Sequence, residues 1–190
     1  MHPSANAFDY LIILLSIILG LAIATLLGNF ARLIDNRERI KLYWVSVLWA
    51  ILLFLIQIQH WWSEYALQSV AHWTFGLFLL VLLTPVGLFL LSSIVLPQTI
   101  DGNEDIEAWY YRNRVWFFSI WMTLPLISFA KDAVNGSFAW NLNNGLQLIA
   151  FFLLGTALFT ENRRAHAALV IVLAALIFYY LVALFVQLPG

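Results

Sequence analysis

Residues 8–34 read FDYLIILLSIILGLAIATLLGNFARLI, and no charged side chain lies between Asp9 and Arg32. A helix needs about 20 mostly apolar residues to cross the hydrocarbon layer of a bilayer. The preceding segment, MHPSANAFDY, has neither the positively charged start nor the small-residue cleavage site of a signal peptide. The sequence therefore predicts a retained transmembrane helix over residues 9–33, and this helix decides the fold class.

The composition of the whole chain agrees with that first helix. Of its 190 residues, 63% are hydrophobic and only 10% are charged, whereas soluble domains are about a quarter charged. A soluble protein of this size exposes much of its surface to water, so a soluble enzyme and a disordered regulator are both excluded. The net charge of −1 indicates no nucleic-acid partner, and the absence of cysteine excludes disulfides and thiolate metal sites.

Five further charge-free stretches complete an all-α polytopic helical bundle. We expect one integral membrane domain, residues 1–190, with six transmembrane helices in the lipid bilayer. The further spans are predicted at residues 42–63, 72–96, 112–132, 142–160 and 166–188. Pro85 and Pro125 lie near the middle of the third and fourth spans and predict a kink in each, because proline removes a backbone hydrogen bond.

The positive charges predict how the chain crosses the membrane. All Lys and Arg residues except Lys131 lie in three of the junctions between spans: Arg32, Arg37, Arg39, Lys41, Arg112, Arg114, Arg163 and Arg164. Cytoplasmic loops are enriched in Lys and Arg. We therefore expect these three junctions in the cytoplasm and both chain termini on the extracytoplasmic side.

The first predicted helix carries a small residue at every fourth position: Ser16, Gly20, Ala24 and Gly28. Such a row lets another helix approach closely. It predicts a tightly packed helix, either within the single chain or between chains of a homo-oligomer or a complex with another membrane protein.

The longest polar stretch, PQTIDGNEDIEAWYYRNR over residues 97–114, precedes the fourth span. Asn103 is predicted to cap a helix whose first turn contains Glu104, Asp105 and Glu107, where carboxylates suit the positive end of the helix dipole. The stretch is either an interfacial start of the fourth helix or a docking site for a partner.

Polar side chains are costly inside a membrane, so their positions are the best guide to function. The predicted topology places one set near the extracytoplasmic ends of the spans: Gln57, His60, Glu64, His72, Lys131, Asp132, Asn143, Asn144 and Gln147. The set either converges on one polar cavity open to that side, or each side chain reaches the membrane interface separately.

His60, Glu64 and His72 are also compatible with a metal site, and two histidines on adjacent helices with a haem. However, the sequence has no HExxH motif, and no second carboxylate lies on the same helical stripe. We therefore predict no catalytic residues and no cofactor, with a metal or haem as the alternative. The simpler interpretation is an interfacial histidine hydrogen-bonded to Glu64.

The opening stretch, together with Tyr43-Trp44, Leu48-Trp49 and Trp61-Trp62, resembles a group of uncharacterised bacterial multi-pass integral membrane proteins. The likeness covers mainly the first three spans. It implies a location in a bacterial inner membrane and carries over no activity and no site residues.

Three classes of function follow from these features. A small channel or transporter would use the extracytoplasmic polar set as a pathway, and this is the interpretation that the sequence favours. A non-catalytic subunit or sensor would bind a partner through the first helix. A histidine-ligated redox or metal-binding membrane protein would use His60 and His72.

Overall fold

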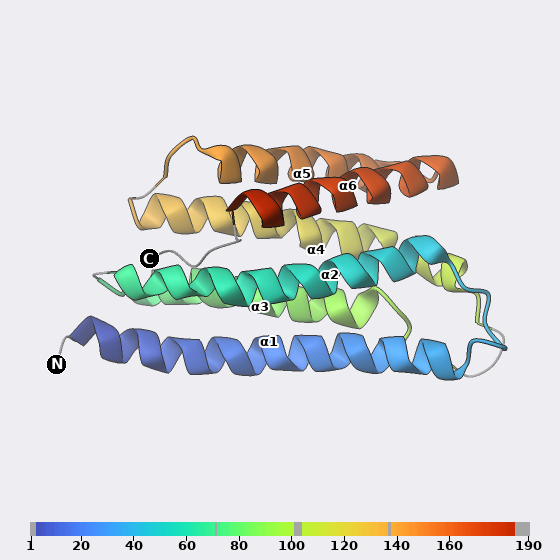
Figure 1. Cartoon of the computed structure of the whole chain (residues 1–190), viewed down its shortest axis with the longest axis horizontal. Helices are drawn as coiled ribbons and strands as arrows, with labels where there is room; N and C mark the ends of the chain where they lie inside the picture. The colour runs from blue at the N-terminus through green and yellow to red at the C-terminus, as the bar shows by residue number, and fades with distance from the viewer. Residues whose placement is uncertain (1–2, 71, 101–103, 137, 185–190) are drawn as a thin grey trace.

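The computed structural model describes residues 3–70, 72–100, 104–136 and 138–184, in which six long helices lie side by side (Figure 1). These helices are α1 (Pro3–Asp35), α2 (Trp44–Ser63), α3 (Phe75–Ile94), α4 (Ile106–Val134), α5 (Leu142–Phe159) and α6 (Arg163–Leu184), and a short 3-10 helix, η1 (Glu64–Ser69), follows α2. Each of the six is long and apolar enough to cross a membrane. The predicted all-α bundle is therefore confirmed.

Three helices begin earlier than the predicted spans: α1 at Pro3 rather than at residue 9, and α4 and α6, which side chains cap. α4 starts at Ile106 rather than near residue 112, since the Asp105 carboxylate accepts hydrogen bonds from the backbone N–H groups of Glu107 and Ala108. The cap is thus Asp105, and the predicted cap Asn103 lies outside the described residues. Asn162 accepts from two backbone N–H groups in the same way, so α6 starts at Arg163 rather than at residue 166. Residues 185–188 of the predicted sixth span also lie outside the described part.

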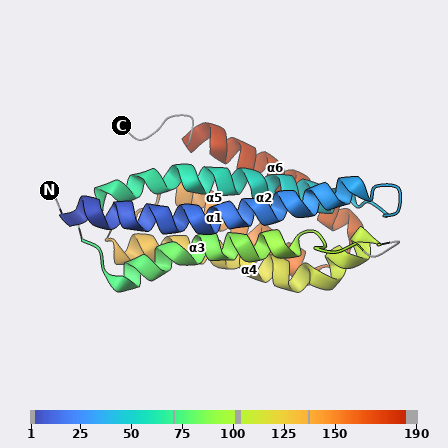
Figure 2. The ribbon, with the colours of Figure 1, turned by 90° about the horizontal axis from the view of Figure 1, so that it is seen from below.

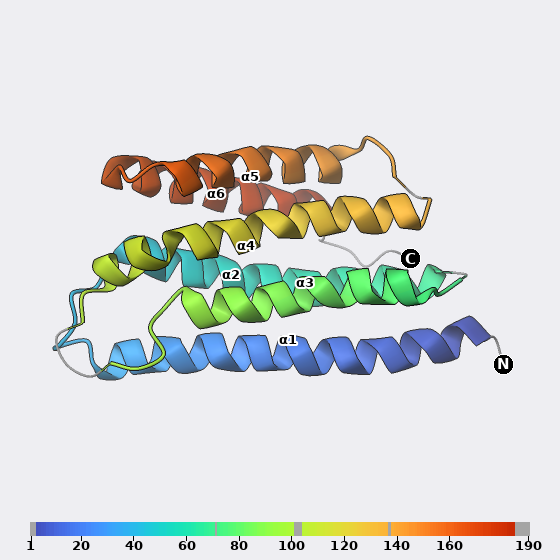
Figure 3. The same ribbon diagram turned by 180° about the vertical axis from the view of Figure 1, so that it is seen from behind.

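The helices form a closed ring with α2 as its most connected member. α1 lies at one side of the bundle, flanked by α2 and α3, as the view in Figure 2 shows. α4, α5 and α6 lie on the other side (Figure 3). Because α2 contacts α1, α3, α4 and α6, its buried side chains are distributed among several neighbouring helices.

α1 packs through leucines and not through its row of small residues. Leu11, Leu15 and Leu19 are buried, whereas Ser16 and Gly20 on the adjacent face are exposed. Ala24 of the row is exposed and Gly28 is half-buried. A Cβ atom added at Gly20 would meet nothing within 4 Å. Within the single chain, the row Ser16, Gly20, Ala24 and Gly28 is therefore not the main packing face of α1, and its packing between chains stays a prediction.

Both prolines lie inside helices where α3 and α4 come together. Pro85 of α3 and Pro125 of α4 are buried. Two residues after Pro85, a Cβ atom added at Gly87 would lie 2.7 Å from Cδ2 of Leu124, so this glycine allows a close approach of the two helices. The two helices thus meet tightly at mid-bundle.

The alternating helix directions separate two ends of the bundle. The connections α1–α2, α3–α4 and α5–α6 lie at one end, which we call the basic end because it carries eight of the nine Lys and Arg residues. Two backbone hydrogen bonds join Lys41 to Glu104 and Ile106 there, which ties the first of these connections to the start of α4. The connections α2–α3 and α4–α5 lie at the opposite end, which we call the Glu64 end.

Candidate functional site

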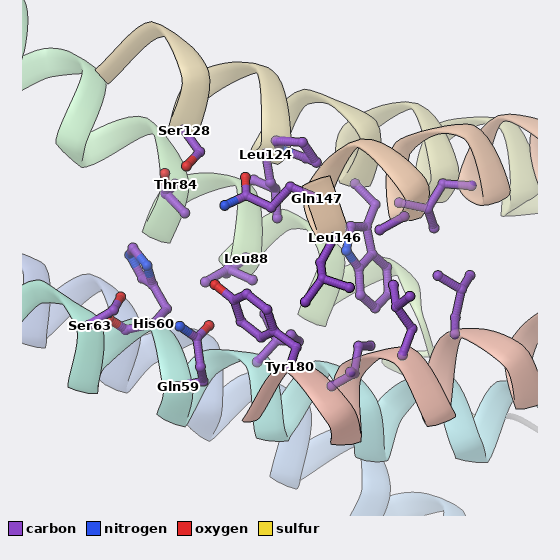
Figure 4. A pocket seen from close by; sticks show the side chains of 18 of the residues that line it. Gln59, His60, Ser63, Thr84, Leu88, Leu124, Ser128, Leu146, Gln147 and Tyr180 are labelled. Carbon is purple, nitrogen blue, oxygen red and sulfur yellow. The ribbon is translucent and has the colours of Figure 1, made fainter. Parts of the chain in front are cut away.

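A cavity of about 180 Å³ lies among α2, α3, α4, α5 and α6. Its polar lining residues gather toward the Glu64 end, and its other lining residues are mainly leucines and aromatic rings (Figure 4). The polar lining residues are Gln59, His60, Ser63, Thr84, Ser128, Lys131, Gln147 and Tyr180. The cavity therefore combines an apolar chamber with one polar end.

A buried carboxylate lies beside the polar end. Glu64, the first residue of η1, is only 3% exposed. Its Oε1 lies 3.4 Å from Nζ of Lys131, which reaches it from α4, and 3.4 Å from Nδ1 of His60, one turn earlier in the chain. Burying a carboxylate without a partner is very costly, so these two contacts compensate its charge.

Two atoms at the polar end have no hydrogen-bond partner among the residues that the structure describes. They are Nε2 of His60 and Oε2 of Glu64, and both are buried. Buried polar atoms are nearly always paired in folded proteins, with protein groups or with water. These two atoms are therefore unsatisfied among the described residues, and of the two residues only His60 lines the cavity.

α5 and α6 add a hydrogen-bonded amide cluster to the wall of the cavity. Oδ1 of Asn143 accepts from Nε2 of Gln147 at 3.0 Å and from the Tyr180 hydroxyl at 2.8 Å. Asn144 is fully buried and donates to the backbone carbonyl of Ala139 at 2.7 Å. The cluster holds Gln147 and Tyr180 in place at the cavity.

Six of the nine predicted site residues do not line the cavity: Glu64, Asn143 and Asn144 contact other residues of this group, and Gln57, His72 and Asp132 lie elsewhere. Gln57 is buried, but it donates to the Ser92 hydroxyl at 2.8 Å and so faces α3. His72 is exposed in the connection before α3, and Asp132 follows Lys131 on another side of α4. The structure thus brings together His60, Glu64, Lys131, Asn143, Asn144 and Gln147, and leaves Gln57, His72 and Asp132 outside.

The predicted alternative of a metal site finds no support in the geometry. Within residues 3–70, 72–100, 104–136 and 138–184, no three His, Asp or Glu side chains are grouped closely enough to hold a metal ion. His60 and Glu64 lie together, but His72 does not join them.

A second polar cluster, which the sequence analysis missed, extends from the cavity wall to the basic end. Trp49, which lines the cavity, donates from Nε1 to the Tyr110 hydroxyl at 3.3 Å. That hydroxyl lies 2.7 Å from Nδ1 of His166, and Nε2 of His166 lies 2.9 Å from the carbonyl oxygen of Thr160. An indole N–H only donates and a carbonyl oxygen only accepts. Every hydrogen bond in this series therefore has a donor and an acceptor when His166 carries its proton on Nε2.

Charged and aromatic groups close this cluster at the basic end. Arg114, whose side chain is 11% exposed, donates to the Thr160 carbonyl and to the Glu161 carboxylate, both at 3.0 Å. Tyr43 lies against Tyr110 and Tyr111, and burial together with the Tyr111 hydroxyl raises the pKa of Tyr43 above its ordinary value.

The sequence did contain signals for the residues that were missed. His166 is a lone histidine in the first turn of the last span, and ionisable residues in spans indicate function by default. Helical spacing places His166, Leu173, Ile177 and Tyr180 on one face of α6, and all four are at least half-buried. Extending that face along the span would have pointed to Tyr180.

Comparisons with protein-family models, with curated proteins and with solved structures found no match. The resemblance to bacterial multi-pass membrane proteins therefore remains a prediction. The functional argument depends on the geometry of the bundle and its cavity.

Proposed function

We propose that this integral membrane protein is a small transporter or channel that admits a small molecule from the extracytoplasmic side into the cavity. The observation that carries the proposal is the buried Glu64 carboxylate at the polar end, compensated by His60 and Lys131. Ionisable groups inside a membrane protein typically mark pathways for substrates or ions. Ligand sites combine an apolar lining with a few convergent polar groups, as this cavity does.

The distribution of positive charge supports the direction of access. The basic end belongs in the cytoplasm by the positive-inside rule, which puts the Glu64 end and both chain termini outside. We place the protein in a bacterial inner membrane on the basis of the sequence resemblance.

Flux into proteoliposomes tests this proposal. Stopped-flow light scattering reports entry of glycerol or 1,2-propanediol, and a pH-sensitive dye under a potassium diffusion potential reports proton movement. We expect at least one of these fluxes to exceed that of protein-free liposomes. His60→Leu should lower it several-fold, because His60 lines the cavity.

His72→Leu is the matched control, because His72 is exposed and lies outside the cavity. It should leave the flux unchanged. Folded protein with no flux above protein-free liposomes, or equal losses in the two histidine variants, would contradict the proposal.

A second candidate function is that of a non-catalytic subunit that binds a membrane partner or a second copy through α1. The observation that favours it is the exposed position of Ser16, Gly20 and Ala24. Gly20→Ile should abolish co-purification with such a partner while leaving the single chain folded, because a Cβ at Gly20 meets nothing within 4 Å. An unchanged elution volume and unchanged co-purifying species in Gly20→Ile would argue against this candidate.

A further inference from the structure

We propose that the cavity binds an uncharged molecule with an apolar body and a hydrogen-bond-donating head group, such as an alcohol or a phenol. The head group donates to Nε2 of His60, and the body fills the apolar chamber. This inference rests on the proposed function and names the class of molecule that the cavity takes.

The size and lining of the cavity define the body of the ligand. An engineered cavity of about 150 Å³ lined by apolar side chains binds benzene. The present cavity of about 180 Å³ has room for a slightly larger molecule, such as a substituted benzene ring. Trp49 and Trp121 are T-shaped neighbours, with ring centroids 5.1 Å apart, and both line the chamber. An aromatic or aliphatic body therefore fits the chamber better than a polar one.

The charges at the polar end favour an uncharged ligand. The Glu64 carboxylate faces the Lys131 ammonium at 3.4 Å, so the two charges compensate one another. A carboxylate ligand would add a negative charge next to Glu64, and an ammonium ligand would add a positive charge next to Lys131. Either addition leaves an uncompensated charge in a poorly solvated site.

The orientation of His60 determines which head group it accepts. Nδ1 of His60 lies 3.4 Å from the Glu64 carboxylate, and an N–H facing a carboxylate is favoured over a lone pair. In the neutral imidazole, Nε2 then carries the lone pair and accepts a hydrogen bond. Nε2 is buried, and it has no partner within the described part of the chain. The ring extends from α2 toward the side of the cavity where Thr84 and Ser128 lie (Figure 4).

A hydrogen-bond donor on the ligand therefore pairs with Nε2 of His60, which has no partner among the described residues. The buried Oε2 of Glu64 lies at the same end and is a second acceptor without a partner among the described residues. An ether of the same shape offers no donor, so it leaves Nε2 of His60 unsatisfied. Leaving a buried acceptor unpaired reduces affinity, and about tenfold is the expected difference for one such hydrogen bond.

Three brominated probes of similar size test the inference with the full chain in detergent. 4-Bromophenol has a donor head group, 4-bromoanisole replaces the donor with an ether, and 4-bromobenzoate carries a negative charge. Bromine quenches tryptophan fluorescence at short range, and Trp49 and Trp121 line the cavity. We expect 4-bromophenol to bind about tenfold more tightly than either of the other probes.

Two variants of His60 test whether Nε2 causes the preference for 4-bromophenol over 4-bromoanisole. His60→Asn retains a polar group near Glu64 but has no atom at the position of Nε2, so the preference for phenol over anisole should fall toward one. His60→Gln is long enough to place its carbonyl oxygen near that position and should retain most of the preference. Circular dichroism shows whether each variant keeps the helical fold.

The possible outcomes distinguish a failure of the inferred ligand class from a failure of the proposed function. Equal binding of phenol and anisole by the natural chain, or a preference unchanged in His60→Asn, would overturn the inference and leave a cavity that binds small molecules. Tighter binding of benzoate would overturn the assignment of an uncharged ligand. No binding of any probe would contradict both the inference and a ligand-accessible cavity.

Discussion

At the scale of single residues, the decisive feature is a carboxylate whose partners come from two places in the chain. His60 lies one helical turn before Glu64, but Lys131 comes from α4 and is 67 positions away. Each partner alone leaves part of the carboxylate unsatisfied, and Oε2 has no partner in the described residues even with both present. The site is therefore electrically compensated but incompletely hydrogen-bonded, which suits a binding site better than a structural ion pair.

Replacing Lys131 with methionine should destabilise the protein, because it leaves the Glu64 carboxylate buried without its cation. Breaking a buried ion pair from one side costs about 3–5 kcal/mol. We expect a loss near the lower end, about 3 kcal/mol, since the Lys131 side chain is 19% exposed. Thermal or denaturant unfolding in detergent measures the change.

Adding Glu64→Gln to Lys131→Met should recover most of the lost stability, because the uncompensated charge is then absent. Arg37→Met is the matched control, since Arg37 pairs with Glu38 on the surface with both side chains mostly exposed. That change should stay within about 0.5 kcal/mol. A Lys131→Met protein as stable as the natural chain would show that the ion pair does not hold Glu64.

At the scale of helices, α3 and α4 approach one another closely beside the cavity. Gly87 has no side chain, and Leu124 of α4 occupies the space that a Cβ would need. Leu124 also lines the cavity, next to Pro125. The packing of two helices at one glycine is therefore coupled to the shape of the chamber.

Gly87→Ala should push Leu124 toward the cavity, because the new Cβ would lie 2.7 Å from Cδ2 of Leu124. Overpacking of this kind costs about 1–3 kcal/mol. Because Cδ2 ends a flexible side chain next to the cavity, we expect a stability below that of Gly145→Ala and weaker binding of 4-bromophenol than in the natural chain. Unfolding in detergent and tryptophan quenching measure the two effects.

Gly145→Ala in α5 is the matched control, because a Cβ there meets nothing within 4 Å. Replacing an unobstructed helical glycine with alanine should raise stability by up to about 1 kcal/mol. If Gly87→Ala stabilises the protein as much as Gly145→Ala does, then α3 and α4 do not approach as closely as the structure shows.

At the scale of the whole molecule, the bundle has two chemically different ends. The basic end carries eight of the nine Lys and Arg residues, together with the Tyr110–His166 cluster. The Glu64 end carries the polar part of the cavity. The helix directions place these features at opposite ends, so the orientation of the chain in the membrane decides which side reaches the cavity (Figure 1).

Cysteine labelling tests that orientation, and the natural chain has no cysteine to interfere. Arg37 at the basic end and Gln68 at the Glu64 end are both exposed. We expect a membrane-impermeant maleimide to label Gln68→Cys in intact cells, and to label Arg37→Cys only after the cells are opened. The unmodified chain is the control for background labelling. The reverse pattern would turn the polar end of the cavity toward the cytoplasm.

The sequence by itself determined the six apolar helices, the separation of the cations to one end and the pairing of His60 with Glu64, because hydropathy, charge and helical spacing are local properties. Contacts between distant helices were decided only by the tertiary structure. It joined Lys131 to Glu64, turned Gln57 toward Ser92, buried His166 beside Tyr110 and left Ser16, Gly20 and Ala24 of α1 exposed. The physical reason is that helical periodicity shows which residues share a face, whereas the neighbour of that face depends on how all six helices pack.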